Sequence, residues 1–170
     1  MKDKNSKHIL SIMVDNEPGV LARVVGLFSG RGYNIESLSV SEVDSHKFLS
    51  RITIVTSGTK IIVDQIKAQL NKLIPVHNLL DITELKSFIG KELILIKLDV
   101  KRKEVSRIYK FIDKYGAKIL FDNKDEIIIE FSGTPSEISK IINELNQYNV
   151  VELTRSGLVS MALGKKYIKR

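Results

Sequence analysis

The first residues whose types and spacing could support chemistry lie in the segment DNEPGVLARV, residues 15–24, where a polar stretch leads directly into an apolar helical pattern. Pro18 suits the first turn of a helix because its φ is already set and it has no amide hydrogen to leave unbonded. Gly19 has no side chain, so a ligand can come close to the backbone. The first amides of a helix lie at its positive end without partners in the helix, which suits a carboxylate. The alternative interpretation is a plain structural turn.

Neighbouring side chains could bind further groups of a ligand besides its anionic group. Asn16 lies just before the helix and Asn34 at the start of the next strand, so two amide groups are available for an ammonium or a carboxylate. Val20 and Leu21 add apolar surface. The combination indicates a small amphiphilic anion, such as an apolar amino acid.

Catalytic and metal-binding patterns are missing from the sequence. Three histidines have no partner at metal-ligand spacing, and a solvated or edge-strand role is the usual one for such residues: His8, His46 and His77. No GxSxG context surrounds a serine, Gly30-Arg31-Gly32 lacks the third glycine of a dinucleotide fingerprint, and there is no cysteine. We therefore predict no catalytic residue and no metal site, and the lack of cysteine fits a reducing, cytoplasmic setting.

The elements that must position the candidate site follow the order β-α-β-β-α-β. They are a strand at 8–14, a helix ended by SGRGYN, strands at 34–42 and 48–56, a helix capped by Thr59, and a strand at 76–83. The same order returns with a strand at 92–100, a helix ended by Gly116, a hairpin around NKD, a helix opened by Thr134-Pro135 and a strand at 150–157. We predict an α+β fold of two consecutive ferredoxin-like domains, each an antiparallel sheet with helices on one face.

Domain boundaries follow from this repeat. We expect a basic tail at residues 1–7, a first domain at 8–85, a second domain at 92–157, and a basic tail at 158–170. The connection at 86–91 contains one glycine between two strand-like runs.

The positive net charge would suit a nucleic-acid partner, but the location of the charge along the chain argues against such a partner. The net charge is +7, of which residues 1–7 carry +2 and residues 164–170 carry +4, so the body is nearly neutral. RNA-binding domains of this fold stack bases on aromatic residues of the central strands, and only Phe48 lies there, at a strand start. No apolar run approaches the roughly 18 residues that span a bilayer. We expect no nucleic-acid and no membrane partner.

A family resemblance covers residues 8–164. The run NEPGVLARVVGLFSGRGYNIESLSV, followed by LSRITIV, resembles the N-terminal ACT domain of the small regulatory subunit of acetolactate synthase (acetohydroxyacid synthase). The likeness continues through QLNKLIPV, KELILIKLDV and TRSGLVSMALG. One departure is Leu163, since the family often has arginine before the glycine of the final motif. This departure puts in question how strongly the chain activates the catalytic subunit.

The resemblance implies a non-catalytic subunit in branched-chain amino acid biosynthesis. Such a subunit binds and activates the catalytic subunit and makes it sensitive to a branched-chain amino acid, typically valine, held between two ACT domains of a homodimer. Carried onto this sequence, the effector residues are Asn16, Gly19, Val20 and Leu21 from one chain and Asn34 and Ile35 from the other. Thiamine diphosphate, Mg²⁺ and FAD are expected on the catalytic subunit and no cofactor on this chain. The alternatives are an orphan ACT-type amino-acid sensor that acts on another enzyme or a repressor, and a nucleic-acid-binding module.

Overall fold

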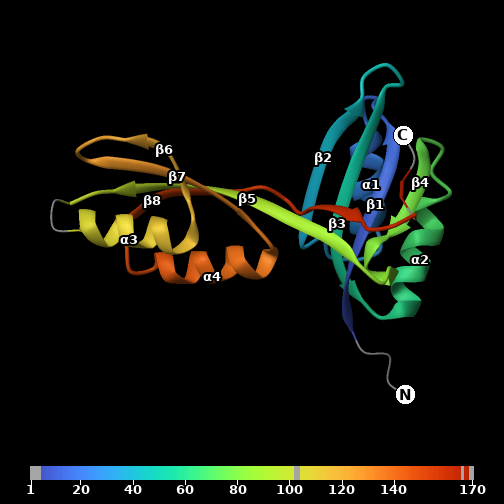
Figure 1. Ribbon diagram of the computed structural model, residues 1–170. Helices are drawn as coiled ribbons and strands as arrows, with labels where there is room; N and C mark the ends of the chain where they lie inside the picture. Colours follow the sequence, from blue (N-terminus) through green and yellow to red (C-terminus); the bar gives the residue numbers. More distant parts are fainter. Residues whose placement is uncertain (1–4, 102–103, 166, 169–170) are drawn as a thin grey trace. The chain divides into compact units, whose positions relative to one another are not determined.

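Two units, each built on an antiparallel sheet, make up the chain in the computed structural model, which describes residues 5–101, 104–165 and 167–168 (Figure 1). Unit 1 comprises residues 1–89 together with 158–170, and unit 2 comprises residues 90–157. Within the described ranges, no helix is long and apolar enough to cross a bilayer.

Unit 1 has the predicted order of elements. They are β1 (Ser6–Asp15), α1 (Val20–Ser29), β2 (Ser37–Asp44), β3 (Leu49–Gly58), α2 (Lys60–Leu70), β4 (Val76–Asp81) and the 3₁₀ turn η1 (Ile82–Glu84). The strand order in the sheet is β2-β3-β1-β4, with all neighbours antiparallel. The central pair, β1 and β3, is in register from Ser6 opposite Gly58 to Asp15 opposite Leu49.

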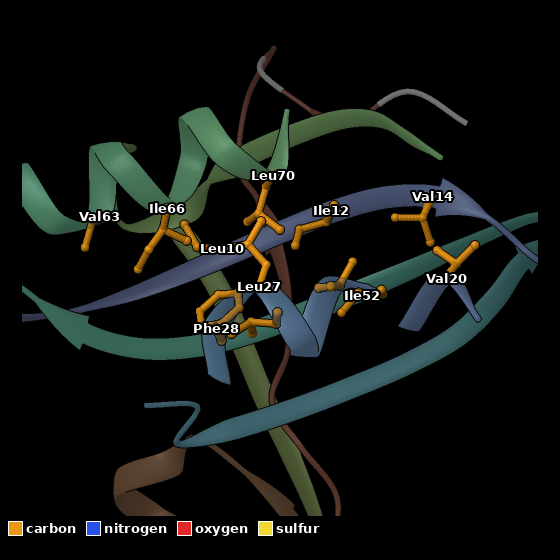
Figure 2. Packing of buried hydrophobic residues seen from close by; sticks show 12 residues of the cluster. Leu10, Ile12, Val14, Val20, Leu27, Phe28, Ile52, Val63, Ile66 and Leu70 are labelled. Carbon is orange, nitrogen blue, oxygen red and sulfur yellow. The ribbon is translucent and has the colours of Figure 1, made fainter. Parts of the chain in front are cut away.

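The main core of unit 1 lies between its sheet and its two helices. Alternate residues of β1 face this core because side chains alternate across a strand, and they pack against the apolar faces of α1 and α2 (Figure 2). The buried members labelled there are Leu10, Ile12, Val14, Val20, Leu27, Phe28, Ile52, Val63, Ile66 and Leu70. Thr59 caps α2 by accepting the N–H of Ile62, as its position predicts.

Unit 2 repeats the arrangement, so the predicted fold of two ferredoxin-like domains is confirmed. Its elements are β5 (Phe88–Asp99), α3 (Val105–Tyr115), β6 (Lys118–Asp122), β7 (Glu126–Gly133), α4 (Pro135–Leu145) and β8 (Val150–Arg155). The strand order is β6-β7-β5-β8. Thr134 and Glu137 form a capping box at the start of α4, and Gly116 ends α3 with a φ of 62°.

The boundary between the units falls within the predicted interval 86–91. The division lies between Ile89 and Gly90, and β5 runs through both residues. Most of the expected connection, from Phe88 onward, is therefore part of a strand.

The C-terminal segment corrects the prediction of a tail from residue 158. Residues Val159–Ala162 form β9, which pairs with β5, and Leu158 is buried against Ile9, Val55 and Ile82. The N–H of Leu158 donates to Ser37 Oγ at 3.1 Å, and its carbonyl accepts from Ser39 Oγ at 2.8 Å. In Figure 1 this red segment crosses the sheet of unit 1 on the face away from α1. Several of the basic residues assigned to the two tails, at 1–4, 166 and 169–170, lie outside the described residues.

Replacing Leu158 tests how firmly this segment is held. Leu158→Ala removes a side chain that is 3% exposed, so we expect the free energy of unfolding to fall by about 2–3 kcal/mol. Leu163→Ala, in the same segment but 50% exposed, is the matched control and should change it by less than about 0.5 kcal/mol. Urea unfolding followed by circular dichroism measures both. A change of less than about 0.5 kcal/mol for Leu158→Ala as well would mean that Leu158 is not anchored.

Candidate functional site

The segment before α1 is a type II β-turn. The N–H of Val20 donates to the Glu17 carbonyl at 3.3 Å, and Gly19 has φ 85° and ψ −9°, the values of the third residue of such a turn. Pro18 therefore occupies the second position of the turn, and the prediction that it lies in the first turn of the helix is wrong. The positive φ of Gly19 is the physical reason, because it breaks the helical conformation between Pro18 and Val20.

The N-terminus of α1 is open to an anion. The helix begins without a side-chain cap and without an acidic residue in its first turn. Its first i→i−4 hydrogen bond runs from Arg23 to Gly19 at 3.0 Å, so the amides of Leu21 and Ala22 precede the helical ladder. Apart from Gly19 itself and its neighbours Pro18 and Val20, no atom of the described residues lies within 4 Å of the position that a Cβ on Gly19 would take. The positive end of the helix is thus neither neutralised locally nor covered.

Asn16 is fixed beside this turn by the start of β3. Its N–H donates to the Phe48 carbonyl at 2.7 Å, and its Oδ1 accepts from Ser50 Oγ at 3.0 Å. With the amide oxygen occupied, the remaining polar group is the NH₂ donor, which suits a carboxylate better than an ammonium.

Ser50 and Phe48 are site residues that the sequence reasoning missed. Ser50 orients Asn16, and this contact depends on the register between β1 and β3, which spacing does not reveal. The sequence did contain a signal for Phe48, because it is an aromatic residue in a polar hairpin. The structure gives it a φ of 51° and leaves it 67% exposed beside the turn.

Val20 and Leu21 have different surroundings. Val20 is 3% exposed and belongs to the core, so its side chain anchors α1 rather than facing solvent. Leu21 is 37% exposed and is the apolar side chain available beside the turn.

Asn34 and Ile35 lie at the other end of α1. Asn34 is exposed, with its carbonyl held by Thr56 Oγ1 at 2.7 Å, and Ile35 packs partly against the core. Asn16 is attached to β3 at Ser50 and Asn34 at Thr56, six positions further along that strand. At about 3.3 Å per residue this separation is about 20 Å. Within one chain, the structure therefore brings together Asn16, Gly19, Val20 and Leu21 but leaves Asn34 and Ile35 apart from them.

His8 is held within the sheet of unit 1 by neighbouring polar side chains. His8 lies on the central strand β1, where its Nδ1 is 2.7 Å from Asp81 Oδ2 and its Nε2 is 2.9 Å from Ser6 Oγ. The expectation of a solvated or edge-strand residue is therefore wrong for His8, because residue 81 of β4 comes to lie beside it in the sheet. The other oxygen of Asp81 accepts the N–H of Thr83 at 3.0 Å and caps η1. In the part of the chain that the structure describes, no three metal-ligating side chains gather.

Comparison with known proteins covers both units. Residues 10–78 match the family model described as an AHAS small subunit-like ACT domain, and residues 91–164 match that of the small subunit of acetolactate synthase. A probable acetolactate synthase small subunit of Archaeoglobus fulgidus is 41% identical over 94% of this chain and 99% of its own length. The acetolactate synthase small subunit of Mycolicibacterium smegmatis is 37% identical, covering 99% of this chain and 98% of its own. The crystal structure of the small subunit from Thermotoga maritima superposes with a TM-score of 0.87 at 32% identity, over 95% of this chain and 99% of that one.

Two glycines of the α1 region should respond oppositely to alanine. Gly19→Ala forces a side chain into a φ of 85° and should lower the free energy of unfolding by about 1–2 kcal/mol. Gly26→Ala, within the helix and with open space around it, should raise it by about 0.5–1 kcal/mol. Thermal unfolding of both variants checks the turn geometry, and stabilisation by Gly19→Ala would contradict it.

Proposed function

Because the chain belongs to the family of acetolactate synthase small subunits, we propose that it is the regulatory subunit of an acetolactate synthase in branched-chain amino acid biosynthesis. It binds the catalytic subunit, raises its activity and makes it sensitive to valine. The carboligation chemistry and its cofactors reside on the catalytic subunit. The observation that carries the valine site is the uncapped start of α1, with Asn16 fixed beside it.

The separation of the two groups of site residues supports a dimer. Asn34 and Asn16 lie at opposite ends of α1 and β3, about 20 Å apart, so one small amino acid does not reach both in one chain. A twofold axis that reverses the direction of these elements brings the turn of one chain to Asn34 of the other. Because such an interface is self-complementary, it creates two equivalent sites. The edge strand β2, with Val40 43% exposed, offers a surface for this pairing.

Valine matches the groups that this arrangement would offer. Its carboxylate would accept from the amides of Leu21 and Ala22 and from the Asn16 NH₂ group. Its ammonium would donate to the side-chain oxygen of Asn34 from the other chain. Leu21 and Ile35 would contact the isopropyl group.

Regulation then follows from where valine binds. A ligand held by two chains favours the dimer arrangement in which both halves of the site meet, and the catalytic subunit responds to that arrangement. A coupling free energy of about 1–3 kcal/mol is sufficient for a useful response.

Reconstitution tests this function directly. The chain is mixed with the catalytic subunit, and acetolactate formation is measured with and without valine. We expect activation in the absence of valine and loss of activity as valine is added. If the chain leaves the catalytic activity unchanged, the proposed function is wrong.

Gly19→Asp should remove valine sensitivity and retain activation. The added carboxylate fills the space above Gly19 and repels the ligand's own carboxylate at the helix start. The strain at φ 85° costs about 1 kcal/mol, which the fold should tolerate because aspartate is among the residues that visit this region. Gly26→Asp, the same change seven residues later and within α1, is the control and should keep the valine response. If valine inhibits the Gly19→Asp complex as it does the unmodified one, the ligand does not bind at this turn.

Mixed dimers test whether each site contains residues of two chains. Asn16→Ala and Asn34→Ala homodimers should each bind valine about 1–3 kcal/mol more weakly, since each of their sites lacks one amide. A heterodimer of the two variants has one site with both changes and one with neither. Calorimetry on heterodimers purified through two different tags should give about half the wild-type stoichiometry at wild-type affinity. Weak binding at both sites of the heterodimer would instead mean that each site lies within one chain.

A further inference from the structure

Arg51 lies in the middle of β3, on the face of the unit 1 sheet away from the helices. Its cross-strand neighbours are Met13 on β1 and Ser41 on β2. The guanidinium Nε donates to Ser11 Oγ at 2.8 Å, and Nη2 donates to the carbonyl of Ser160 in β9 at 2.7 Å. Burial lowers the pKa of Arg51 because the cation loses contact with water, but a guanidinium remains charged at neutral pH.

No carboxylate of the described residues forms an ion pair with this guanidinium. Its hydrogen bonds to Ser11 and Ser160 go to neutral oxygens and use Nε and Nη2, whereas an arginine has five N–H donors. A partly buried cation without a counter-ion is costly, and a planar pair of donors matches a carboxylate.

A cavity of about 350 Å³ opens beside this guanidinium. Apart from Arg51 its described lining is uncharged and mostly apolar, including Met13, Val43, Leu80, Ile82 and Ile168. The volume is in the range of small-molecule sites, which combine apolar walls with a few polar groups.

A second polar group beside Arg51 also lacks a partner. The Ser160 hydroxyl is buried, with the residue 7% exposed, and it forms no hydrogen bond with the described part of the chain. The carbonyl of the same residue is the one that accepts from Arg51. Buried hydroxyls usually have a partner, so the residue that holds Arg51 carries a donor without one, although Ser160 does not itself line the cavity.

We propose that this cavity, the Arg51 cavity, binds a small aliphatic monocarboxylate. The guanidinium holds the carboxylate and the apolar lining covers the aliphatic part. The described lining has no carboxylate to pair with an ammonium, so the cavity favours an acid without an amino group over an amino acid. It lies on the opposite face of the sheet from α1, so it is a different site from the turn at Gly19.

Binding of 4-methylpentanoate to the full chain, measured by calorimetry, tests this site. The neutral analogue 4-methylpentan-1-ol and the amino acid leucine serve as comparison ligands. We expect the carboxylate to bind at least about tenfold more tightly than the alcohol and leucine. The alcohol cannot form a charged hydrogen-bonded pair with Arg51, and the ammonium group of leucine opposes one.

Substitutions locate the binding. Arg51→Gln should weaken 4-methylpentanoate binding at least about tenfold, whereas Arg23→Gln, the same change on α1, should leave it unchanged. Val43→Trp fills the cavity while Arg51 itself is retained, and it should also abolish binding; it therefore tests the site even if Arg51→Gln fails to fold. Gly19→Asp should bind the acid normally.

Four results would each overturn the proposal. They are no binding to the unmodified chain, equal binding of acid and alcohol, unchanged binding by both Arg51→Gln and Val43→Trp, and loss of binding in Gly19→Asp. Because this assay contains neither valine nor the catalytic subunit, its outcome is independent of the proposed regulatory function.

Discussion

The structure of unit 1 depends on β1, a central strand that is buried on both faces. Six consecutive residues, from Ile9 to Val14, are buried, and the strand pairs with β3 over ten positions. One face of β1 forms the main core with α1 and α2, and the other packs under Leu158 and Ile82. Because the register with β3 is fixed on both faces, a slip of one residue would exchange two different sets of buried side chains. The two ends of β3 can therefore serve as fixed attachment points for the loops at Asn16 and Asn34.

The two faces of this sheet offer different chemistry to a ligand. On the helical side, the charge available at the Gly19 turn is the partial positive charge of a helix end, supplied by backbone amides. On the other side it is the full charge of Arg51, surrounded by apolar side chains. A helix end attracts a carboxylate only modestly, because its charge is partial. A half-buried guanidinium attracts it more strongly but tolerates a neighbouring ammonium poorly.

Much of the fold follows from sequence patterns that have a local cause. The alternating apolar residues, Thr59 and Thr134 as caps, and Gly116 at a helix end all predict elements that the structure contains. The run HILSIMV also carried the signal of a strand buried on both faces, which implies that something covers the second face. Part of that cover comes from Leu158 and the adjoining β9, whose four residues are too few to show a strand pattern, so its strand character arises from its partners and not from its own sequence. The Ser50 contact to Asn16 was equally hidden, since it depends on the register of strands 34 residues apart in sequence.

In the proposed effector site, the length of α1 is what makes binding depend on two chains. Its ten residues rise about 15 Å, and they separate Gly19 at one end from the loop that carries Asn34 at the other. A monomer would therefore offer valine only a helix end and one amide, which bind an amino acid weakly in water. In the proposed dimer the second half of the site comes from a second chain, so effector binding and chain association would be thermodynamically linked. In that arrangement, whatever strengthens the pairing of two chains would also raise the affinity for the effector, and the effector would strengthen the pairing in return. On this proposal, an α1 of ten residues is sufficient to make the response to a metabolite depend on the state of the dimer.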